Sequence, residues 1–129
     1  MIGAGRIDFI AVPTQDRDRA ESFYAETLGL RKNPLSTETW VEFETDNVTL
    51  ALVEPEKFDL PFEPLPFGAL AIRVPDVAEA RRKLEEAGIE FTGDIWDSGV
   101  CNGAAFRDPE GNGLLLHHRY APYLDGSLP

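Results

Sequence analysis

The chain contains the same succession of predicted elements twice, and this internal repeat restricts the fold more than any other feature. Phe9 and Ala69 lie early in two predicted strands and are 60 residues apart. Ala20 and Ala80 lie on the apolar faces of the two following helices and are also 60 residues apart. Self-similarity at a fixed offset predicts two copies of one supersecondary unit.

Each repeat begins with a predicted strand followed by a predicted helix. The strands are 7–13 and 69–75, and the helices are 16–29 and 76–88. In both helical segments the apolar residues recur at spacings of three and four, which places them on one helical face. We therefore expect each helix to pack against the strands of its own repeat.

Both predicted helices carry start and stop signals. Asp16 and Asp76 stand at the N-cap positions, and Glu79 follows Asp76 at the spacing of a capping box. Gly29 and Gly88 stand just after the last helical residues, where a left-handed conformation is common. These residues predict where the two helices begin and end.

Further strands complete each repeat, so the organisation is two βαβββ modules. These strands are predicted at 39–44 and 48–53 in the first repeat and at 103–107 and 113–119 in the second. Prolines are concentrated between the repeats and favour an extended linker over 55–67. The predicted organisation is one domain, 1–129, with modules at about 6–54 and 68–119 and a tail at 120–129.

The composition is typical of a soluble cytoplasmic protein. A chain of 129 residues can bury enough surface to fold without a disulfide or structural metal. The single cysteine excludes an intrachain disulfide and fits a reducing compartment. We find no secretory signal at the N-terminus and no apolar run long enough to span a bilayer.

The net charge of −11 restricts the choice of partner. Nucleic acids and anionic membranes attract positive surfaces, so neither is expected to bind. A cationic small molecule would be attracted. The alternative interpretation is that the acidic surface only maintains solubility.

Two segments carry a resemblance to a known family. The run FYAETLGL follows a strand and a short acidic turn, and FRDPEGNGLLL lies near the C-terminus. Together with the repeat, they resemble the vicinal oxygen chelate superfamily, which includes glyoxalase I, bleomycin-resistance and extradiol dioxygenase families. The resemblance covers residues 6–119. It implies an α+β fold in which two βαβββ modules form curved mixed sheets around a cleft, with the helices outside.

The superfamily includes isomerases, epimerases, dioxygenases, thiol transferases and non-catalytic drug binders, so the resemblance does not define an activity. It also implies a homodimer.

Alternation along each strand separates a helix-facing side from an inward side. The inward side is predicted to line a ligand cavity formed by Phe9, Ala11, Thr49, Ala51, Val53, Ala69, Ala71, Arg73, Leu115 and His117. Many of these residues are small, which leaves volume for a ligand. The alternative is that small residues allow the two sheets to pack closely, with no cavity.

The positions that bind metal in metal-using members are apolar in this chain. The resemblance puts Phe9 and Ala69 where those members have histidine. It puts Ala51 and Leu115 where they have a carboxylate or another polar ligand, although Glu54 lies only three residues from Ala51. Side chains of Phe, Ala and Leu have no donor atom for a divalent ion. We therefore expect no metal and no cofactor.

Three polar or aromatic residues are further candidates for ligand contact. His117 faces inward and is a candidate acid or base, or else a histidine hydrogen-bonded at a strand end. Arg73 can clamp a carboxylate or phosphate, or can pair with a carboxylate of the chain. Trp40 can stack on a flat or cationic ligand, or can pack in the core. A second tryptophan, Trp96, is expected just before the sixth strand.

The sequence leads to two main functional hypotheses. The first is a metal-free small-molecule binder resembling bleomycin-resistance proteins, with a cationic or aromatic ligand. Its candidate ligand-binding residues are Phe9, Trp40, Ala51, Ala69, Arg73, Leu115 and His117. The second is a glyoxalase- or dioxygenase-type enzyme with an unorthodox or absent metal site, in which His117 and Arg73 take part in proton transfer. A third hypothesis is a subunit or a regulator whose pocket is vestigial.

Overall fold

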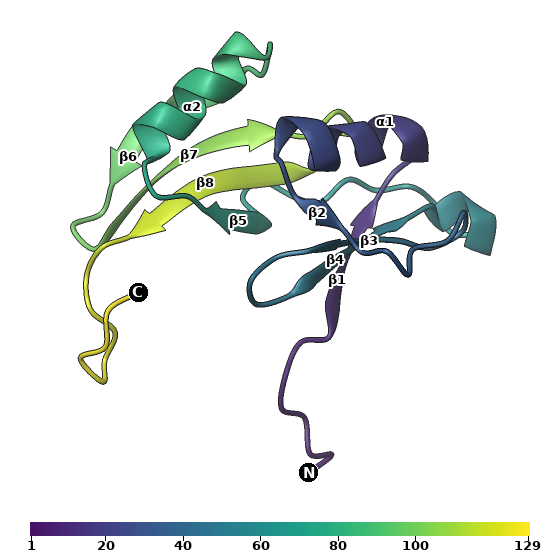
Figure 1. The fold of residues 1–129 in the computed structure, drawn as a ribbon, viewed down its shortest axis with the longest axis horizontal. Coiled ribbons are helices and arrows are strands. Elements are labelled where there is room, and N and C mark those ends of the chain that lie inside the picture. The colour runs from purple at the N-terminus through teal and green to yellow at the C-terminus, as the bar shows by residue number, and fades with distance from the viewer. The chain divides into compact units, whose positions relative to one another are not determined.

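The computed structural model describes all residues, 1–129, as two compact units, 1–64 and 65–129 (Figure 1). The boundary lies inside the predicted proline-rich linker. Each unit contains one four-stranded sheet, called sheet A in residues 1–64 and sheet B in residues 65–129. No helix is long and apolar enough to cross a membrane.

The first unit contains four strands and one principal helical segment. Its elements are β1 (Phe9–Pro13), α1 (Arg17–Ser22), the π-helical turn η1 (Phe23–Thr27), β2 (Arg31–Lys32), β3 (Val41–Glu44), β4 (Thr49–Val53) and the 3₁₀ turn η2 (Pro55–Phe58). The strand order in sheet A is β1-β4-β3-β2. β1 is parallel to β4, and the other pairs are antiparallel.

The second unit repeats this arrangement. Its elements are β5 (Leu70–Arg73), α2 (Val77–Glu86), β6 (Phe91–Asp97), β7 (Cys101–Arg107) and β8 (Gly113–Arg119). The order in sheet B is β5-β8-β7-β6, again with one parallel pair, β5 and β8. The equivalent strand orders confirm the prediction of two βαβββ modules and an α+β fold.

Several predicted boundaries were wrong in detail. The short strand β2 was not predicted, and the first helix ends as a π turn, in which Leu28 N–H donates to Phe23 O (2.9 Å). Trp96 lies within β6 and not before it. The segment 55–67 is not extended throughout, because it begins with η2, where Pro55 occupies an early helical position that suits its fixed φ angle.

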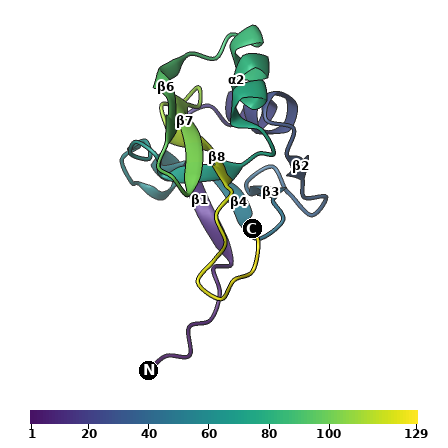
Figure 2. The same ribbon diagram turned by 90° about the vertical axis from the view of Figure 1, so that its left-hand side faces the viewer.

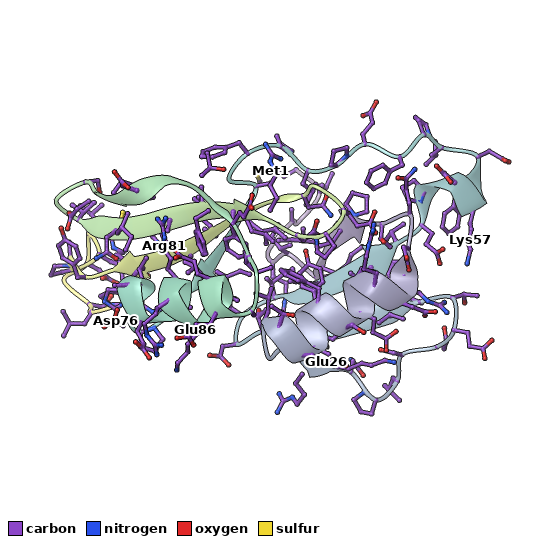
Figure 3. The ribbon with its side chains drawn as sticks, turned by 90° about the horizontal axis from the view of Figure 1, so that it is seen from above. Met1, Glu26, Lys57, Asp76, Arg81 and Glu86 are labelled. Carbon is purple, nitrogen blue, oxygen red and sulfur yellow. The ribbon has the colours of Figure 1, made fainter.

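The predicted helix caps are confirmed. Asp16 Oδ1 accepts a hydrogen bond from Arg19 N (3.1 Å), and Asp76 Oδ1 accepts one from Glu79 N (2.9 Å). Figure 3 labels Asp76, Arg81 and Glu86 along α2. Gly88 adopts a φ angle of 91° just after α2, in the left-handed region that glycine enters at little cost.

Each helix covers one face of its own sheet. In the first unit the buried aromatic residues are Phe23 and Tyr24 of η1 and Phe43 of β3, and the rings of Tyr24 and Phe43 lie 6.1 Å apart. In the second unit α2 contacts β6, β7 and β8 (Figure 2), with Val77 and Leu84 buried on its sheet-facing side. The apolar stripes of the helices therefore form the cores that hold the sheets.

Candidate functional site

The face of each sheet that its own helix leaves uncovered is called its open face, and the open face of sheet A carries aromatic and acidic side chains. Burial alternates along β1, where Val12 is buried and Phe9 is 46% exposed. Cross-strand pairing places Phe9 beside Thr49, and Ala51 beside Glu42. Directly paired residues project from the same face of a sheet. This face therefore carries Phe9, Ala11, Glu42, Glu44, Thr49, Ala51 and Val53.

An aromatic pair stands on this open face. The rings of Phe9 and Trp40 lie 5.5 Å apart with an interplanar angle of 88°, an edge-to-face arrangement. The indole Nε1–H of Trp40 donates a hydrogen bond to Glu42 Oε1 (2.6 Å). Trp40 therefore belongs to the open face and not to the core, and its ring is held by contacts from two directions.

The two carboxylates beside this pair are organised by hydrogen bonds. Asn33 Nδ2 donates to Glu42 Oε2 (3.3 Å) and to Glu44 Oε1 (2.8 Å), and Thr49 Oγ1 donates to Glu44 Oε2 (3.1 Å). Together with the Trp40 bond, each of the four carboxylate oxygens accepts a hydrogen bond. The arrangement fixes negative charge next to Trp40, which favours a cationic group at this surface.

A pocket of about 360 Å³ adjoins the aromatic pair. It is lined by Thr39, Trp40, Val53, Glu54, Lys57 and Phe58. The Lys57 ammonium pairs with Glu54 Oε1 (2.8 Å), so Glu54, the carboxylate near the Ala51 metal position, is held in an ion pair. Phe58 comes from η2 and is 63% exposed. The pocket thus extends the apolar surface of Trp40.

A second hollow, of about 370 Å³, lies elsewhere in this unit and offers little apolar surface. It is lined by Arg17, Glu21, Lys32, Ser36, Thr37, Glu38 and Val41. Two of its opposite charges, Lys32 and Glu21, form an ion pair with each other. We favour the Trp40 pocket because flat apolar surface contributes more to small-molecule binding than paired surface charges.

The open face of sheet B brings together other predicted residues. Ala71 and Arg73 of β5 pair with Leu115 and His117 of β8, and all four project from the open face. Ala69 is exposed and lies just before β5, not within the strand. Of these residues, Leu115 and His117 are half-buried.

The side chain of Arg73 has no carboxylate partner, so the predicted alternative of an internal ion pair is not seen. Its Nη1 and Nη2 both donate to the carbonyl oxygen of Arg119, at 3.3 Å. His118, which follows His117 in β8, projects to the opposite face of the sheet, where its Nδ1 lies 3.0 Å from Val74 O. Only His117 of the histidine pair therefore faces the open side.

The residues present do not fit a metal of the kind used by metal-dependent members of the resembled superfamily. Phe9, Ala51, Ala69 and Leu115 have no donor atoms, and Ala51 is fully buried. No group of three or more His, Cys, Asp or Glu side chains is arranged to hold an ion. The absence of bound metal nevertheless stays a prediction that requires elemental analysis.

Some site residues were missed by reasoning from the sequence. Glu42 and Glu44 alternate along β3, and Trp40 immediately precedes this strand at the same period of two, which was a usable signal. Asn33 and Phe58 carried no such signal, because they reach the site from a loop and from a 3₁₀ turn. The orientation of Trp40 was also left open by the sequence.

The two equivalent sheets and their strand orders agree with the comparison with known proteins. Residues 6–116 match the family described as Glyoxalase/Bleomycin resistance protein/Dioxygenase superfamily. The chain belongs to this superfamily. Comparison with curated proteins gave no match.

Solved structures with the same fold include proteins of different described roles. An antibiotic-binding protein, TnmS3 from Streptomyces sp. CB03234, is 25% identical, with a TM-score of 0.74 over 92% of this chain and 99% of that one. A superfamily member from Sphaerobacter thermophilus is 24% identical, with a TM-score of 0.74 over 88% and 97%. Lactoylglutathione lyase from Agrobacterium tumefaciens is 22% identical, with a TM-score of 0.71 over 89% and 94%. The latter two similarities concern the fold alone.

Proposed function

We propose that this protein binds a small, flat, cationic aromatic molecule on the open face of sheet A, without metal and without chemical conversion of the ligand. The observation that carries the proposal is the Trp40 ring, held edge-to-face with Phe9 and hydrogen-bonded to Glu42. This arrangement presents aromatic surface and fixed negative charge together. The antibiotic-binding role of the structural neighbour TnmS3 supports a binding function.

The chemistry of the face suits a cation with delocalised charge. An indole face attracts a cation with about 0.5–2 kcal/mol, depending on desolvation. Glu42 and Glu44 add Coulombic attraction at close range, and the net charge of −11 adds a weaker attraction that salt screens. Ligand charge and aromaticity should therefore both contribute to affinity.

The direct test is a fluorescence titration of a Trp96→Phe variant, in which Trp40 is the only tryptophan because the chain has two. The probes are N-methylacridinium, a permanent planar cation, and acridine at pH 8, its neutral counterpart. We expect the cation to bind more tightly and to quench Trp40. Glu42→Gln should weaken cation binding about tenfold, which corresponds to about 1.4 kcal/mol.

The matched control is Glu90→Gln, which makes the same change in net charge at an exposed position of the other unit. That variant should bind the cation within about twofold of the parent, since the attraction of an exposed charge that does not contact the ligand is largely screened by salt. Equal losses in both variants would show that only the overall acidity attracts the cation, and the proposed site would be wrong.

The second candidate function is an enzyme in which His117 and Arg73 act in proton transfer. The observation that favours it is their direct pairing across β8 and β5 on the open face. His117 could transfer a proton to or from a bound substrate. Arg73 could stabilise the negative charge that develops on the substrate during that transfer. If turnover of any substrate found by screening is unchanged in His117→Gln, this function is excluded for that reaction.

The homodimer and the cytoplasmic location implied earlier remain proposals. Size-exclusion chromatography with light scattering tests the first, with twice the chain mass of 14.3 kDa as the expected result. Fractionation of the native cells tests the second.

A further inference from the structure

One residue from each strand of sheet B forms a continuous row across the open face. Trp96 of β6 pairs with Gly103 of β7, Gly103 pairs with His117 of β8, and His117 pairs with Arg73 of β5. Directly paired residues share a face, so the row runs from an indole through an imidazole to a guanidinium. None of these residues belongs to the cation site proposed for residues 1–64.

At the aromatic end of the row, the rings of Trp96 and His117 are held in place in the absence of a ligand. The Trp96 and His117 rings lie 6.0 Å apart, tilted by 51°, on either side of Gly103. A Cβ at Gly103 would come within 2.6 Å of Trp96 Cζ2, so only glycine leaves space for the indole. Trp96 is 38% exposed and therefore presents ring surface to solvent.

The cationic end of the row is available to a ligand. Arg73 is exposed, and its Nη atoms make only long bonds of 3.3 Å to one neutral carbonyl oxygen. The next open-face cation along β8, Arg119, instead donates to Ala121 O (3.0 Å) and Pro122 O (2.8 Å) and stacks on Tyr123. Neither arginine is paired with a carboxylate, but the hydrogen bonds of Arg73 are longer than those of Arg119, so Arg73 is the more available of the two to a ligand.

The neighbouring row on the open face of sheet B consists of apolar residues, two of them alanines. Ala71 pairs with Leu115, and Leu115 pairs with Ala105. Ala105 is buried, whereas Ala71 is exposed and its methyl group offers apolar surface beside the row, where the burial of apolar surface favours contact with a flat ring. The row from Trp96 to Arg73 supplies two aromatic rings and one positive charge.

We propose that the open face of sheet B binds a planar aromatic carboxylate, with the ring against Trp96 and His117 and the carboxylate on Arg73. A guanidinium matches a carboxylate in a planar, two-point geometry. Arg73 alone balances a monoanion, whereas a phosphate dianion would require a second cation. The other arginines of this face, Arg107 and Arg119, are held by shorter bonds to backbone carbonyl oxygens. The ligand is therefore an aryl carboxylate and not a phosphate ester.

The test is isothermal titration of the full chain with 2-naphthoate and with 2-naphthalenemethanol, which keeps the ring and lacks the charge. Naphthoate should bind more tightly. Arg73→Gln should weaken naphthoate binding at least about tenfold and leave the alcohol unchanged, since a charge-assisted hydrogen bond to a carboxylate is lost. Arg31→Gln, the same change at an exposed arginine of the other unit, is the control and should have less than about a twofold effect.

A second readout locates the ligand. In Trp40→Phe protein, naphthoate should shift the His117 Hε1 proton resonance by ring current, and His117→Gln identifies that resonance. If Arg73→Gln fails to fold, Arg73→Lys replaces it, with an intermediate loss expected because the charge remains but the two-point geometry is lost.

Three outcomes would overturn the proposal: equal affinity for naphthoate and the alcohol, unchanged affinity in the Arg73 variants, or displacement of naphthoate by equimolar inorganic phosphate. Binding of N-methylacridinium should be unchanged in Arg73→Gln. The proposals for sheet A and sheet B can therefore fail independently.

Discussion

The indole ring of Trp96 lies over Gly103, in the space that a side chain at residue 103 would occupy. The nearest approaches of a Cβ there would be 2.6 Å to Trp96 Cζ2 and 2.8 Å to Leu116 O. Glycine in the middle of a strand ordinarily weakens it, so its presence at this point reflects the close approach of another group. The position of Trp96 on the open face therefore depends on the absence of a Cβ.

Gly103→Ala should displace the indole and destabilise the protein by about 1–3 kcal/mol, the usual cost of overpacking. The measurement is chemical denaturation followed by tryptophan fluorescence in the Trp40→Phe background. Gly5→Ala is the control, because no atom lies within 4 Å of its added Cβ and its backbone is unstrained. An unchanged Trp96 spectrum and unchanged stability would show that the ring is not held over Gly103.

Phe9→Leu should reduce affinity for N-methylacridinium about three- to tenfold. The edge-to-face contact with Trp40 is lost, and such aromatic pairs contribute about 0.5–1.5 kcal/mol beyond buried area. The titration uses the Trp96→Phe background, so that the fluorescence signal comes from Trp40 alone. Ile7→Leu, at an exposed position before β1, is the control. Tighter binding in Phe9→Leu would mean that Phe9 obstructs the ligand.

Asn112→Ala should destabilise the protein by about 2–4 kcal/mol, because buried polar groups left without partners are costly. Asn112 is fully buried; its Oδ1 accepts a hydrogen bond from Leu65 N (2.7 Å), and its Nδ2 donates to Asp108 Oδ2 (2.8 Å). Urea denaturation gives the free energy of unfolding. The exposed Asn47→Ala should change it by less than about 0.5 kcal/mol, and similar values for both variants would contradict the role of Asn112.

The hydrogen bond from Tyr120 Oη to Asp97 Oδ1 (2.6 Å) should make stability depend on pH at both extremes. It lowers the pKa of Asp97 below its ordinary value of 3.8, with help from Gly99 N–H. It raises the pKa of Tyr120 above its ordinary value of 10.0. The stabilisation from Asp97 is complete above pH 3.8 and is lost as pH falls through the lowered pKa. That from Tyr120 is complete below pH 10.0 and is lost as pH rises through the raised pKa.

Tyr120→Phe should therefore melt at a lower temperature than the parent protein at neutral pH, and the difference should shrink in strong acid and in strong alkali. Thermal melts across the pH range measure it, with Tyr123→Phe as a control outside this pair. A difference that is constant across the whole range would contradict the linkage.

Dialysis against EDTA should leave both the melting temperature and the affinity for N-methylacridinium unchanged. The four superfamily metal positions carry no donor atoms, so removal of metal should cost no binding free energy. Elemental analysis of the purified protein should find no stoichiometric transition metal. One equivalent of metal per chain, with a fall in melting temperature on its removal, would contradict this prediction.

The sequence by itself determined the two βαβββ modules, the helix caps and the two faces of most strands. These features depend on local physics: the period of apolar residues, the cap at Asp76 and the conformational freedom of Gly88. Such signals act over a few residues, so they can be read without knowledge of the rest of the chain.

Only the tertiary structure decided which side chains meet. The contact of Trp40 with Phe9, the bridge from Asn33 to two carboxylates, and the row from Trp96 to Arg73 all depend on strand register. Register is set by pairing between segments far apart in the chain, and a shift of one residue would reverse every face. The sequence therefore defined the scaffold, whereas the chemistry of its open faces followed from long-range pairing.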